Sequence, residues 1–469
     1  MNNKEYSNIL ILGAGLSGLT TAYLLAKQGY SVTILEKEEK CGGLCKSIFF
    51  KDIISDIGPH QICSEEDLVI NFVKDILGDD LLIKSRKVSQ YVFGKYIGYP
   101  LKIKDFLFNI NIFLTLKICF EVLIVQLKSF FVHKKEDSFK DWVNNRFGKT
   151  AYEIYFGPYT EKVWGISPDE LDPRTASARI AFKSVFDYLI KSLLFCFRKK
   201  CDYVRAHSPL KNKFYYSKLG IETLINKLQD KCLSLGVNII NNANIVKIDT
   251  LNNDILSIGT SDGKKYRNFD LYISTLPITL IANLFNPNFI DKMPLEFRAI
   301  LIIVLKINRE LEDPYTWIYY PDTDICFQRI TDYNNFDKNM SKLGFTSLSA
   351  EISCDVEDEI WKMKDEDIIF KTKEDLVSSG FINYSDNVEA VVHRERYAYP
   401  IQVNGYIELT AKLLNELSMY SGFISTGRQG LYKYCDMDEV IEMSYDLVEQ
   451  INKEEFVYNL SCNFRGVGV

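Results

Sequence analysis

The stretch of residues 9–36 constrains the fold more than any other part of the chain. It places an apolar run, a glycine-rich turn, a helical pattern, a second apolar run and an acid in that order. Gly13 permits a tight turn, Gly15 lets backbone approach a pyrophosphate, and Gly18 lets the helix pack closely on the strand. Glu36 follows at about the 20-residue distance at which an acid holds the ribose hydroxyls. The stretch predicts dinucleotide binding at the helix N-terminus; the alternative is a tight structural turn in another α/β domain.

Length, charge and cysteine usage narrow the class of protein. The 469 residues are too many for a single hydrophobic core, so we expect two or three domains. A net charge of −6 argues against nucleic-acid binding. Cys41 and Cys45 lie close together, but no second pair has metal-ligand spacing, so no metal site is expected. Unpaired thiols fit a reducing compartment, and the early first strand leaves no room for a targeting peptide, so we expect a cytoplasmic protein.

The residues just past Glu36 favour a flavin dinucleotide over a nicotinamide one. Gly42 and Gly43, followed by Leu44, allow a second close approach of backbone to the cofactor. NAD-dependent dehydrogenases do not usually need this extension, whereas a dinucleotide with a bulky flavin end does. His60 stands in a Gly-Pro loop soon afterwards, and we expect it to lie against the flavin ring. The alternative is a purely structural histidine.

The middle of the chain changes from strands to helices. Residues 86–101 read as two short strands around a glycine turn, which predicts a β-hairpin. The long apolar stretch 106–131 carries too many charged residues for a membrane span, so we predict a pair of amphipathic helices. The alternative is an interfacial helix, because basic residues stand at 133–135 and 198–200. Residues 156–166 gather polar and aromatic side chains, including Trp164, and Arg174 and Arg179 follow.

The last part of the chain returns to the dinucleotide-binding domain. Strands are expected at 237–248, which includes Val246, and at 271–277, 299–307, 317–321 and 327–330. A strand running into Gly427 and Arg428 before a final helix is another anion-binding arrangement. The fold class predicted is α/β, with a discontinuous Rossmann-type FAD-binding domain, a helical domain and an antiparallel-sheet substrate domain. The predicted boundaries are 1–95 with 205–290 and 400–455 for the first, 96–204 for the second and 291–399 for the third.

Taken together, these motifs resemble the UDP-galactopyranose mutase family of flavoenzymes, within the wider amine oxidase and protoporphyrinogen oxidase-like superfamily. The glycine turn, Glu36 and the glycine pair 42–43 match the superfamily in general and imply FAD. The segment 159–164, Tyr-Thr-Glu-Lys-Val-Trp, looks like the family's aromatic-Lys-Trp signature beside the sugar. The segment 427–437 is similar to the closing flavin and substrate motif, and residues 399–400 resemble a Tyr-Pro turn. Tyr319 with Arg329, and Arg179, match residues that contact the substrate diphosphate.

The resemblance implies two sets of site residues and a reaction. The implied cofactor-binding residues are Gly13, Gly15, Gly18, Glu36, Gly43, Leu44, His60, Val246, Gly427, Arg428, Asp436 and Met437. The implied catalytic residues are His60, Trp164, Arg179, Tyr319, Arg329, Tyr399 and Tyr434. The implied activity interconverts the pyranose and furanose forms of a nucleotide-linked hexose of the UDP-galactose type, through an adduct between N5 of reduced FAD and the sugar. The implied partners are a nucleotide-sugar substrate and an external reductant such as NAD(P)H, in polysaccharide or glycan biosynthesis.

Two other functions stay open on the sequence. One is a redox flavoenzyme of the amine oxidase or protoporphyrinogen oxidase type, which the apolar stretch 106–131 favours weakly. The other is a non-catalytic or membrane-docked component of a glycan-assembly complex that keeps FAD for stability. Individual arginines also have a structural alternative, because a surface ion pair is the commoner fate of an arginine. This alternative applies to Arg174, Arg179 and Arg394.

Overall fold

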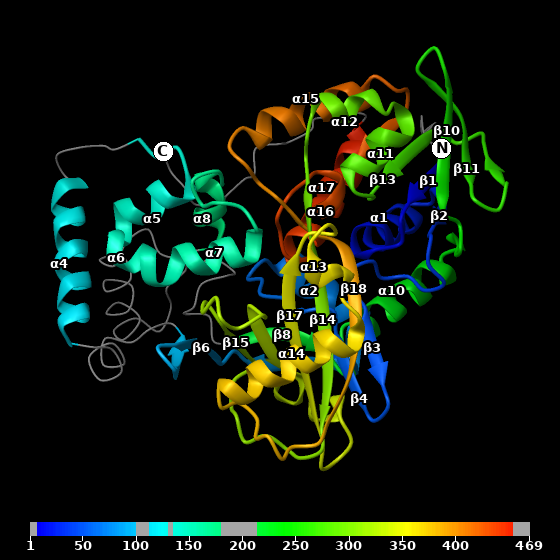
Figure 1. The fold of residues 1–469 in the computed structure, drawn as a ribbon. Coiled ribbons are helices and arrows are strands. Elements are labelled where there is room, and N and C mark those ends of the chain that lie inside the picture. The colour runs from blue at the N-terminus through cyan, green and yellow to red at the C-terminus, as the bar shows by residue number, and fades with distance from the viewer. Residues whose placement is uncertain (1–6, 100–111, 130–134, 180–212, 454–469) are drawn as a thin grey trace.

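A computed structural model describes residues 7–99, 112–129, 135–179 and 213–453 of the chain. Three groups of elements are visible in Figure 1: a parallel sheet with its helices, a large antiparallel sheet below it, and a group of helices to one side. The predicted fold class, a Rossmann-type α/β unit with helical and antiparallel-sheet parts, is confirmed.

A five-stranded parallel sheet carries the glycine turn. Its strand order is β19-β13-β1-β2-β9, and every neighbouring pair is parallel. The strands come from three separate stretches of sequence. They read as continuous apolar runs because both faces of a parallel sheet are covered. The bounds are Asn8–Leu12 for β1, Ser31–Leu35 for β2, Asn238–Ile240 for β9, Leu271–Ser274 for β13 and Phe423–Ser425 for β19.

Two hydrophobic clusters cover the two faces of this sheet. Helices α1 (Leu16–Lys27), α2 (Asp67–Leu77), α10 (Glu222–Ser234) and α17 (Met437–Lys453) pack on one face. On the other face lie α11 (Ile278–Phe285), α12 (Asn288–Lys292), α15 (Tyr406–Ser418) and the small sheet of β10 (Ile245–Leu251), β11 (Asp254–Thr260) and β12 (Lys265–Tyr266). Two-stranded pairs join β3 (Ser47–Phe50) to β4 (Ile53–Asp56), and β5 (Leu81–Ser85) to β8 (Lys213–Ser217).

The second large sheet has seven strands in the order β18-β14-β17-β16-β15-β6-β7. Alternate residues of β14 enter two different hydrophobic clusters, so residues 299–305 of this strand are all apolar instead of alternating. Helices α13 (Glu359–Lys362) and α14 (Asp365–Ser378) lie beside the sheet. The strand bounds are Val88–Val92 for β6, Lys95–Tyr99 for β7, Phe297–Ile307 for β14, Trp317–Tyr319 for β15, Arg329–Asp332 for β16, Thr346–Cys354 for β17 and Val388–Pro400 for β18.

The predicted hairpin of residues 86–101 is confirmed as β6 and β7, but its place in the fold corrects the predicted domain boundary. Strand β6 pairs in parallel with β15, so the hairpin continues the seven-stranded sheet. This pairing joins segments more than 200 residues apart, which hydrophobic patterning along the chain does not reveal. The other domain boundaries stay a prediction.

The helical part contains α4 (Ile112–Ser129), α5 (Phe139–Phe147), α6 (Lys149–Ala151), a π-helical turn (Tyr152–Phe156), α7 (Gly157–Trp164) and α8 (Pro173–Arg179). Ser138 caps α5 by accepting a hydrogen bond from the backbone N–H of Asp141. Within the predicted helical pair of 106–131, the structure describes one helix, α4. No helix among the described residues is long and apolar enough to cross a membrane.

Candidate functional site

The glycine turn after β1 adopts a geometry that suits a dinucleotide. A Cβ on Gly18 would lie 2.0 Å from the carbonyl oxygen of Gly13, so helix and turn pack as closely as predicted. Glu36, at the end of β2, is buried and accepts a hydrogen bond of 2.8 Å from the backbone N–H of Ala14. Its other carboxylate oxygen accepts from the backbone N–H of Glu38 at 3.0 Å. A carboxylate has about four acceptor positions, so capacity for ribose hydroxyls remains.

A second glycine segment lies against the first. Gly15 and Gly42 pair as an isolated parallel bridge, and a Cβ on Gly43 would lie 3.2 Å from the Cα of Gly15. Gly15 also begins α1 without a side-chain cap, so the first N–H groups of the helix need another partner. The buried hydroxyl of Ser17 has no hydrogen-bond partner among the described residues. Together these features place the uncapped start of α1 beside the close approach of two glycine segments, which is called the glycine passage below.

The third predicted segment, 427–437, meets the same place from the C-terminal side. Gly427 begins the short helix α16 (Gly427–Gly430) with φ of +79°, and a Cβ there would lie 2.6 Å from the Ser17 hydroxyl. Arg428 donates hydrogen bonds to the carbonyl oxygens of Cys435 and, at 3.0 Å, Ala398. Its buried Nε has no partner in the described part of the chain. Arg428 therefore fixes the α16–α17 loop to the end of β18 and keeps one unused donor.

Three predicted aromatic residues come together beside Arg428. The ring centroid of Trp164, at the end of α7, lies 5.2 Å from that of Tyr434 and 6.1 Å from that of Tyr399. The two tyrosine rings are 5.5 Å apart, and the Arg428 guanidinium lies 4.8 Å from the Tyr434 ring centroid. The four residues come from three elements that are distant in sequence. They form one aromatic and cationic cluster, called the aromatic cluster below.

His60 lies within electrostatic range of this cluster. Burial, followed by the positive charge of Arg428, lowers the pKa of the imidazole from 6.5 to about 4. The Nδ1 atom of His60 is buried and has no hydrogen-bond partner among the residues that the structure describes. At neutral pH His60 is therefore a neutral imidazole.

Arg329 and Tyr319 stand directly opposite each other on β16 and β15. Arg329 donates from Nε and Nη2 to the two carboxylate oxygens of Glu351, both at 2.6 Å, as a bidentate pair. Glu351 lies on β17 and is fully buried. The pair uses two of the five N–H donors of the guanidinium, so three donors, two of them on Nη1, are not used by Glu351. Tyr319 in turn contacts Tyr159 of α7 with ring centroids 5.7 Å apart.

The remaining predicted residues lie in different parts of the fold. Leu44 follows the glycine pair, while Asp436 and Met437 lie where α17 begins, next to the aromatic cluster residue Tyr434. Val246 lies on β10 of the small three-stranded sheet and is half exposed. Arg179 ends α8, and its side chain lies outside the described residues.

Two of the alternative arginines form ion pairs. Arg174 makes bidentate hydrogen bonds of 2.8 and 2.9 Å to Asp172. Arg394 pairs with Asp365 at 2.6 Å and donates to two backbone carbonyl oxygens. The structural reading of these two residues is confirmed.

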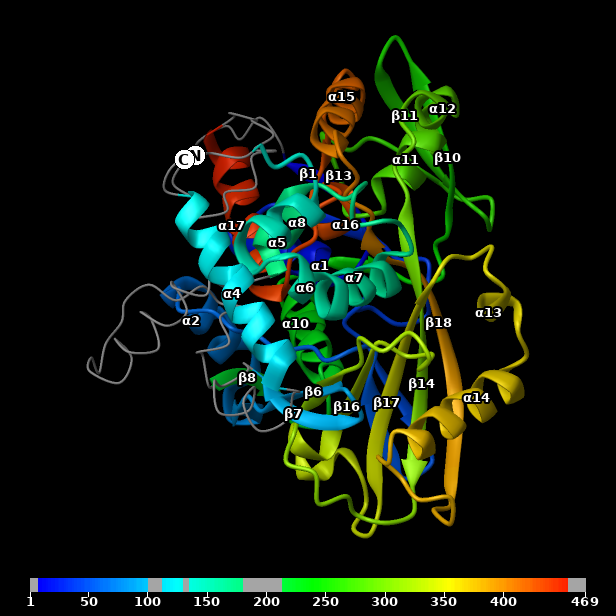
Figure 2. The ribbon, with the colours of Figure 1, turned by 60° about the vertical axis from the view of Figure 1, so that its left-hand side comes forward.

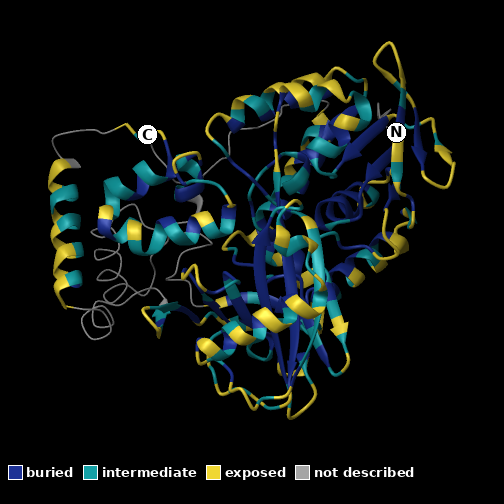
Figure 3. Ribbon diagram, in the orientation of Figure 1, coloured by how far each residue is buried: buried dark blue, intermediate teal, exposed yellow. Residues whose placement is uncertain are grey.

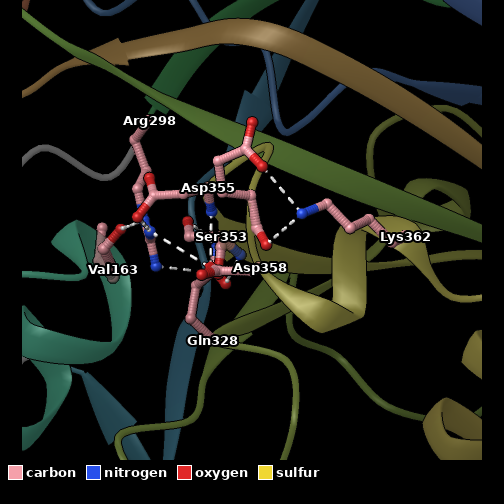
Figure 4. A network of polar contacts seen from close by, with 8 residues as sticks. Val163, Arg298, Gln328, Ser353, Asp355, Asp358 and Lys362 are labelled. Carbon is pink, nitrogen blue, oxygen red and sulfur yellow. Dashed lines mark hydrogen bonds and ion pairs between the residues drawn. The ribbon is translucent and has the colours of Figure 1, made fainter.

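Helix α7 is anchored to the seven-stranded sheet at both Lys162 and the turn after Trp164. Lys162 donates to the backbone oxygens of Tyr320 and Asp322 at 2.9 and 2.6 Å, and burial lowers its pKa from 10.5 to about 8. Arg298 of β14 is only 7% exposed and donates to the carbonyl oxygen of Val163 at 3.4 Å. Figure 4 shows the guanidinium between α7 and the acidic residues Asp355 and Asp358.

The position of Arg298 links this anchor to the aromatic cluster. Arg298 is the register partner of Tyr399, next to an irregularity in the pairing of β14 and β18. A Cβ on Gly165 would lie 2.3 Å from the guanidinium carbon of Arg298, so the chain leaves α7 directly over this side chain. Bulges of this kind often re-aim side chains next to active sites. Arg298 therefore holds the two backbones that carry Trp164 and Tyr399.

The comparisons with known proteins agree with this arrangement. A model of the family described as flavin containing amine oxidoreductase matches residues 16–396. The chain belongs to the flavin containing amine oxidoreductase family. As a member of this flavin containing family, it is a flavoenzyme. The glycine passage, the uncapped α1 and the Ser17 hydroxyl, which has no hydrogen-bond partner among the described residues, fit a flavin dinucleotide.

Several individual proteins are similar to this chain. A probable UDP-galactopyranose mutase of Klebsiella pneumoniae is 31% identical over 199 residues, which are 40% of this chain and 47% of the mutase. A coproporphyrinogen III oxidase of Staphylococcus aureus is 24% identical over 52% of this chain and 55% of the oxidase. The matches thus span about half the length of these two relatives. A solved reduced UDP-galactopyranose mutase aligns at a TM-score of 0.80, with 20% identity, over 97% of this chain and 98% of that one, which shows the shared fold.

Three residues with clear structural roles were not predicted from the sequence. The hydroxyl of Ser17 lies inside the glycine motif itself, so its place in that turn was a usable signal. Glu351 is the one acid in the otherwise uncharged and fully buried strand β17, and such a residue calls for a partner. Arg298 begins an apolar strand, and nothing along the chain reveals that it faces α7.

Proposed function

We propose that this flavoenzyme is an FAD-dependent sugar-nucleotide mutase that interconverts the pyranose and furanose forms of a nucleotide-linked hexose of the UDP-galactose type. The observation that carries the proposal is the aromatic cluster of Trp164, Tyr399, Tyr434 and Arg428 beside the glycine passage. Aromatic faces and hydroxyl-bearing rings suit a sugar, and cations suit a diphosphate. The similarity to the Klebsiella pneumoniae mutase supports the same reaction class.

The residues that would hold FAD are those of the glycine passage and the segment after β19. Uncapped N–H groups at the start of α1 would bind the pyrophosphate, and Glu36 would accept from the ribose hydroxyls. His60 and Gly427 would lie at the flavin end. When bound in its reduced form, FAD would supply a nucleophilic ring nitrogen for the anomeric carbon.

The side chains of this protein would stabilise the leaving diphosphate and keep the sugar in place. Nη1 of Arg329 would donate to a diphosphate oxygen, and we propose Arg179 as the second donor. Negative charge grows on the diphosphate as its bond to the sugar breaks, so these donors are strongest in the transition state. Trp164 would exclude water from one side of the sugar, and Tyr319, Tyr399 and Tyr434 would direct hydroxyls toward it.

Because His60 is neutral, it adds no positive charge near the flavin position at working pH. A neutral imidazole can donate from one nitrogen and accept at the other. We propose that it accepts a hydrogen bond from the sugar or the flavin through one nitrogen while staying uncharged. The net reaction consumes no reductant, so an external donor such as NAD(P)H would be needed only to bring the flavin to its reduced state.

An anaerobic assay with a panel of nucleotide sugars tests the proposal. The purified, chemically reduced protein is incubated with UDP-galactopyranose, UDP-glucose and their GDP and dTDP counterparts, and the products are separated by chromatography. We expect a furanose product from at least one substrate with reduced protein and none with oxidised protein. No product from any sugar with a fully flavin-loaded, reduced protein would contradict the mutase assignment.

The similarity to the Staphylococcus aureus coproporphyrinogen III oxidase favours one alternative, a redox reaction on a porphyrin-type or amine substrate. The two functions differ in electron balance. In the alternative, oxidised flavin becomes reduced as substrate is consumed, and oxygen or another acceptor restores it. Reduction of the oxidised flavin by a porphyrinogen, together with no product from any nucleotide sugar, would establish the redox function.

A further inference from the structure

Helix α4 carries a stripe of exposed apolar side chains on the side that faces away from the other helices that the structure describes. The stripe consists of Phe113, Leu116, Phe120, Leu123 and Leu127, and is called the α4 stripe below. Successive members are three or four residues apart, so they share one face of the helix. Each is between 49% and 78% exposed. Figure 3 shows exposed residues recurring along α4, which lies at the edge of the molecule in Figure 1.

The opposite face of α4 is fixed to the helical part, which keeps the stripe turned outward. The Glu121 carboxylate accepts hydrogen bonds from the backbone N–H and the hydroxyl of Thr150, at 2.8 and 2.6 Å. Gln126 donates to the carbonyl oxygen of Arg146 at 3.4 Å. Figure 2 shows the same helix running along the outside of α5 and α6. Rotation of α4 to bury the stripe would break these bonds.

The charged residues of α4 lie along one border of the stripe. Lys117 and Lys128 are exposed and stand on the same side of the helix, because eleven residues make close to three helical turns. Glu121 stands four residues after Lys117 on that side, within electrostatic range of it, and its carboxylate binds Thr150. The border of the stripe therefore carries two exposed lysines and one acid that Thr150 already binds, although the whole chain has a net charge of −6.

We propose that the α4 stripe docks on the surface of a negatively charged lipid bilayer, with the helix lying in the plane of the interface. Helices with large apolar side chains on one face and lysines at its border bind membranes in this way. The apolar residues would enter the acyl boundary, and Lys117 and Lys128 would meet anionic headgroups. The helix does not span the bilayer, in line with its length and charge.

A second copy of the chain fits the stripe less well. An 18-residue helix is about 27 Å long, so its outer face offers roughly 300 Å². A stable protein interface needs about 800 Å² from each partner. Antiparallel docking of two copies around a twofold axis would also bring the lysine borders together. A lipid surface has neither difficulty, because its area is unlimited and its charge is complementary.

Vesicle flotation of the full, flavin-loaded chain tests the proposal. Phosphatidylcholine vesicles with phosphatidylglycerol are compared with vesicles of phosphatidylcholine alone. We expect flotation with the anionic vesicles, and a tenfold or greater loss of partitioning for the double variant Leu116→Gln/Phe120→Gln. The matched control is Leu343→Gln/Phe370→Gln, which removes two exposed apolar side chains elsewhere and should float like the parent. Lys117→Glu/Lys128→Glu should lose binding to a similar extent.

Two results would overturn the proposal. The first is that the stripe variant, with an unchanged melting temperature and flavin content, floats as well as the parent protein. The second is that the parent forms a concentration-dependent dimer that the same variant abolishes, which would assign the stripe to a second copy. Neither result depends on sugar-nucleotide turnover, so the proposed function stands or falls separately.

Discussion

At the scale of single residues, two buried ionisable groups decide the chemistry of the candidate site. Arg329 is held by Glu351, so its remaining N–H donors keep a fixed direction. His60 is kept neutral by burial and by Arg428. Each group depends on a partner that is distant in sequence, and each dependence can be tested by one substitution.

Substitution of Glu351 tests the buried ion pair. In Glu351→Gln the carboxylate charge is lost and Arg329 stays in the interior with its charge uncompensated. We expect the free energy of unfolding to fall by about 3–5 kcal/mol, measured by urea denaturation. Glu449→Gln is the control, because it breaks the exposed pair with Lys453 and should leave the free energy of unfolding close to that of the parent. Equal, small losses in both variants would show that Arg329 does not rely on Glu351.

The pH dependence of stability tests the state of His60. Its pKa is about 4 in the folded protein and about 6.5 when unfolded, so the unfolded state binds more protons between these values. The His60 contribution is therefore intact above pH 6.5 and is lost as the pH falls toward 4. We expect His60→Gln to show a smaller fall in unfolding free energy over this window than the parent protein. Parallel curves for the two proteins would contradict the lowered pKa.

At the scale of elements, the site depends on two close approaches of backbone or side chain. One is the passage between the glycine turn before α1 and the glycine pair after β2. The other is the anchoring of α7 on the sheet by Arg298. We propose that the first controls cofactor binding and that the second controls the place of the aromatic cluster.

The variant Gly43→Ala tests the passage. The added methyl would lie 3.2 Å from the Cα of Gly15, and backbone has little freedom to yield. We expect flavin affinity to fall at least tenfold, measured by titration of the apoprotein. Gly263→Ala is the control, since Gly263 also has positive φ but no atom within 4 Å of an added Cβ. If both variants bind flavin like the parent, the glycine passage does not carry the cofactor.

The variant Arg298→Ala tests the anchor of α7. Loss of the guanidinium frees the α7 carbonyl oxygen of Val163 and the end of β14, so Trp164 and Tyr399 lose their fixed spacing. We expect kcat/KM for the nucleotide sugar to fall by roughly a hundredfold, because small misplacements at a site have effects of this size. Arg309→Ala breaks a bidentate pair with Asp386 elsewhere in the sheet and serves as the control. An equal fall of kcat/KM in both variants would show that Arg298 only stabilises the fold.

At the scale of the whole molecule, the sequence predicts the features that depend on neighbouring residues. It does not predict the features that depend on the pairing of distant strands. The glycine turn, Glu36 and Gly427 each belong to a local motif that the sequence reveals. The strands that precede them, β1, β2 and β19, lie in one parallel sheet. By contrast, the hairpin of β6 and β7 joins β15 across the chain, and no local pattern marks that edge. Glu351 and Arg298 were missed for the same reason. Their roles depend on partners brought by sheet register and by α7, not on their neighbours in sequence.

The function, too, can be predicted only in part from motifs along the chain. Motifs predict which residues bind the cofactor and which aromatic residues lie near it, and family membership shows a flavoenzyme. The choice between rearranging a sugar and oxidising a substrate depends on what the assembled cluster holds. That choice rests on electron balance, which can be measured on the intact protein.

The most direct measurement is the number of furanose molecules formed for each flavin oxidised, in one anaerobic reaction of the reduced protein with UDP-galactopyranose or the active nucleotide sugar. The mutase account predicts many product molecules for each protein while the flavin absorbance stays that of the reduced form. Product formed in step with flavin oxidation, or no furanose at all from a fully reduced protein, would contradict it.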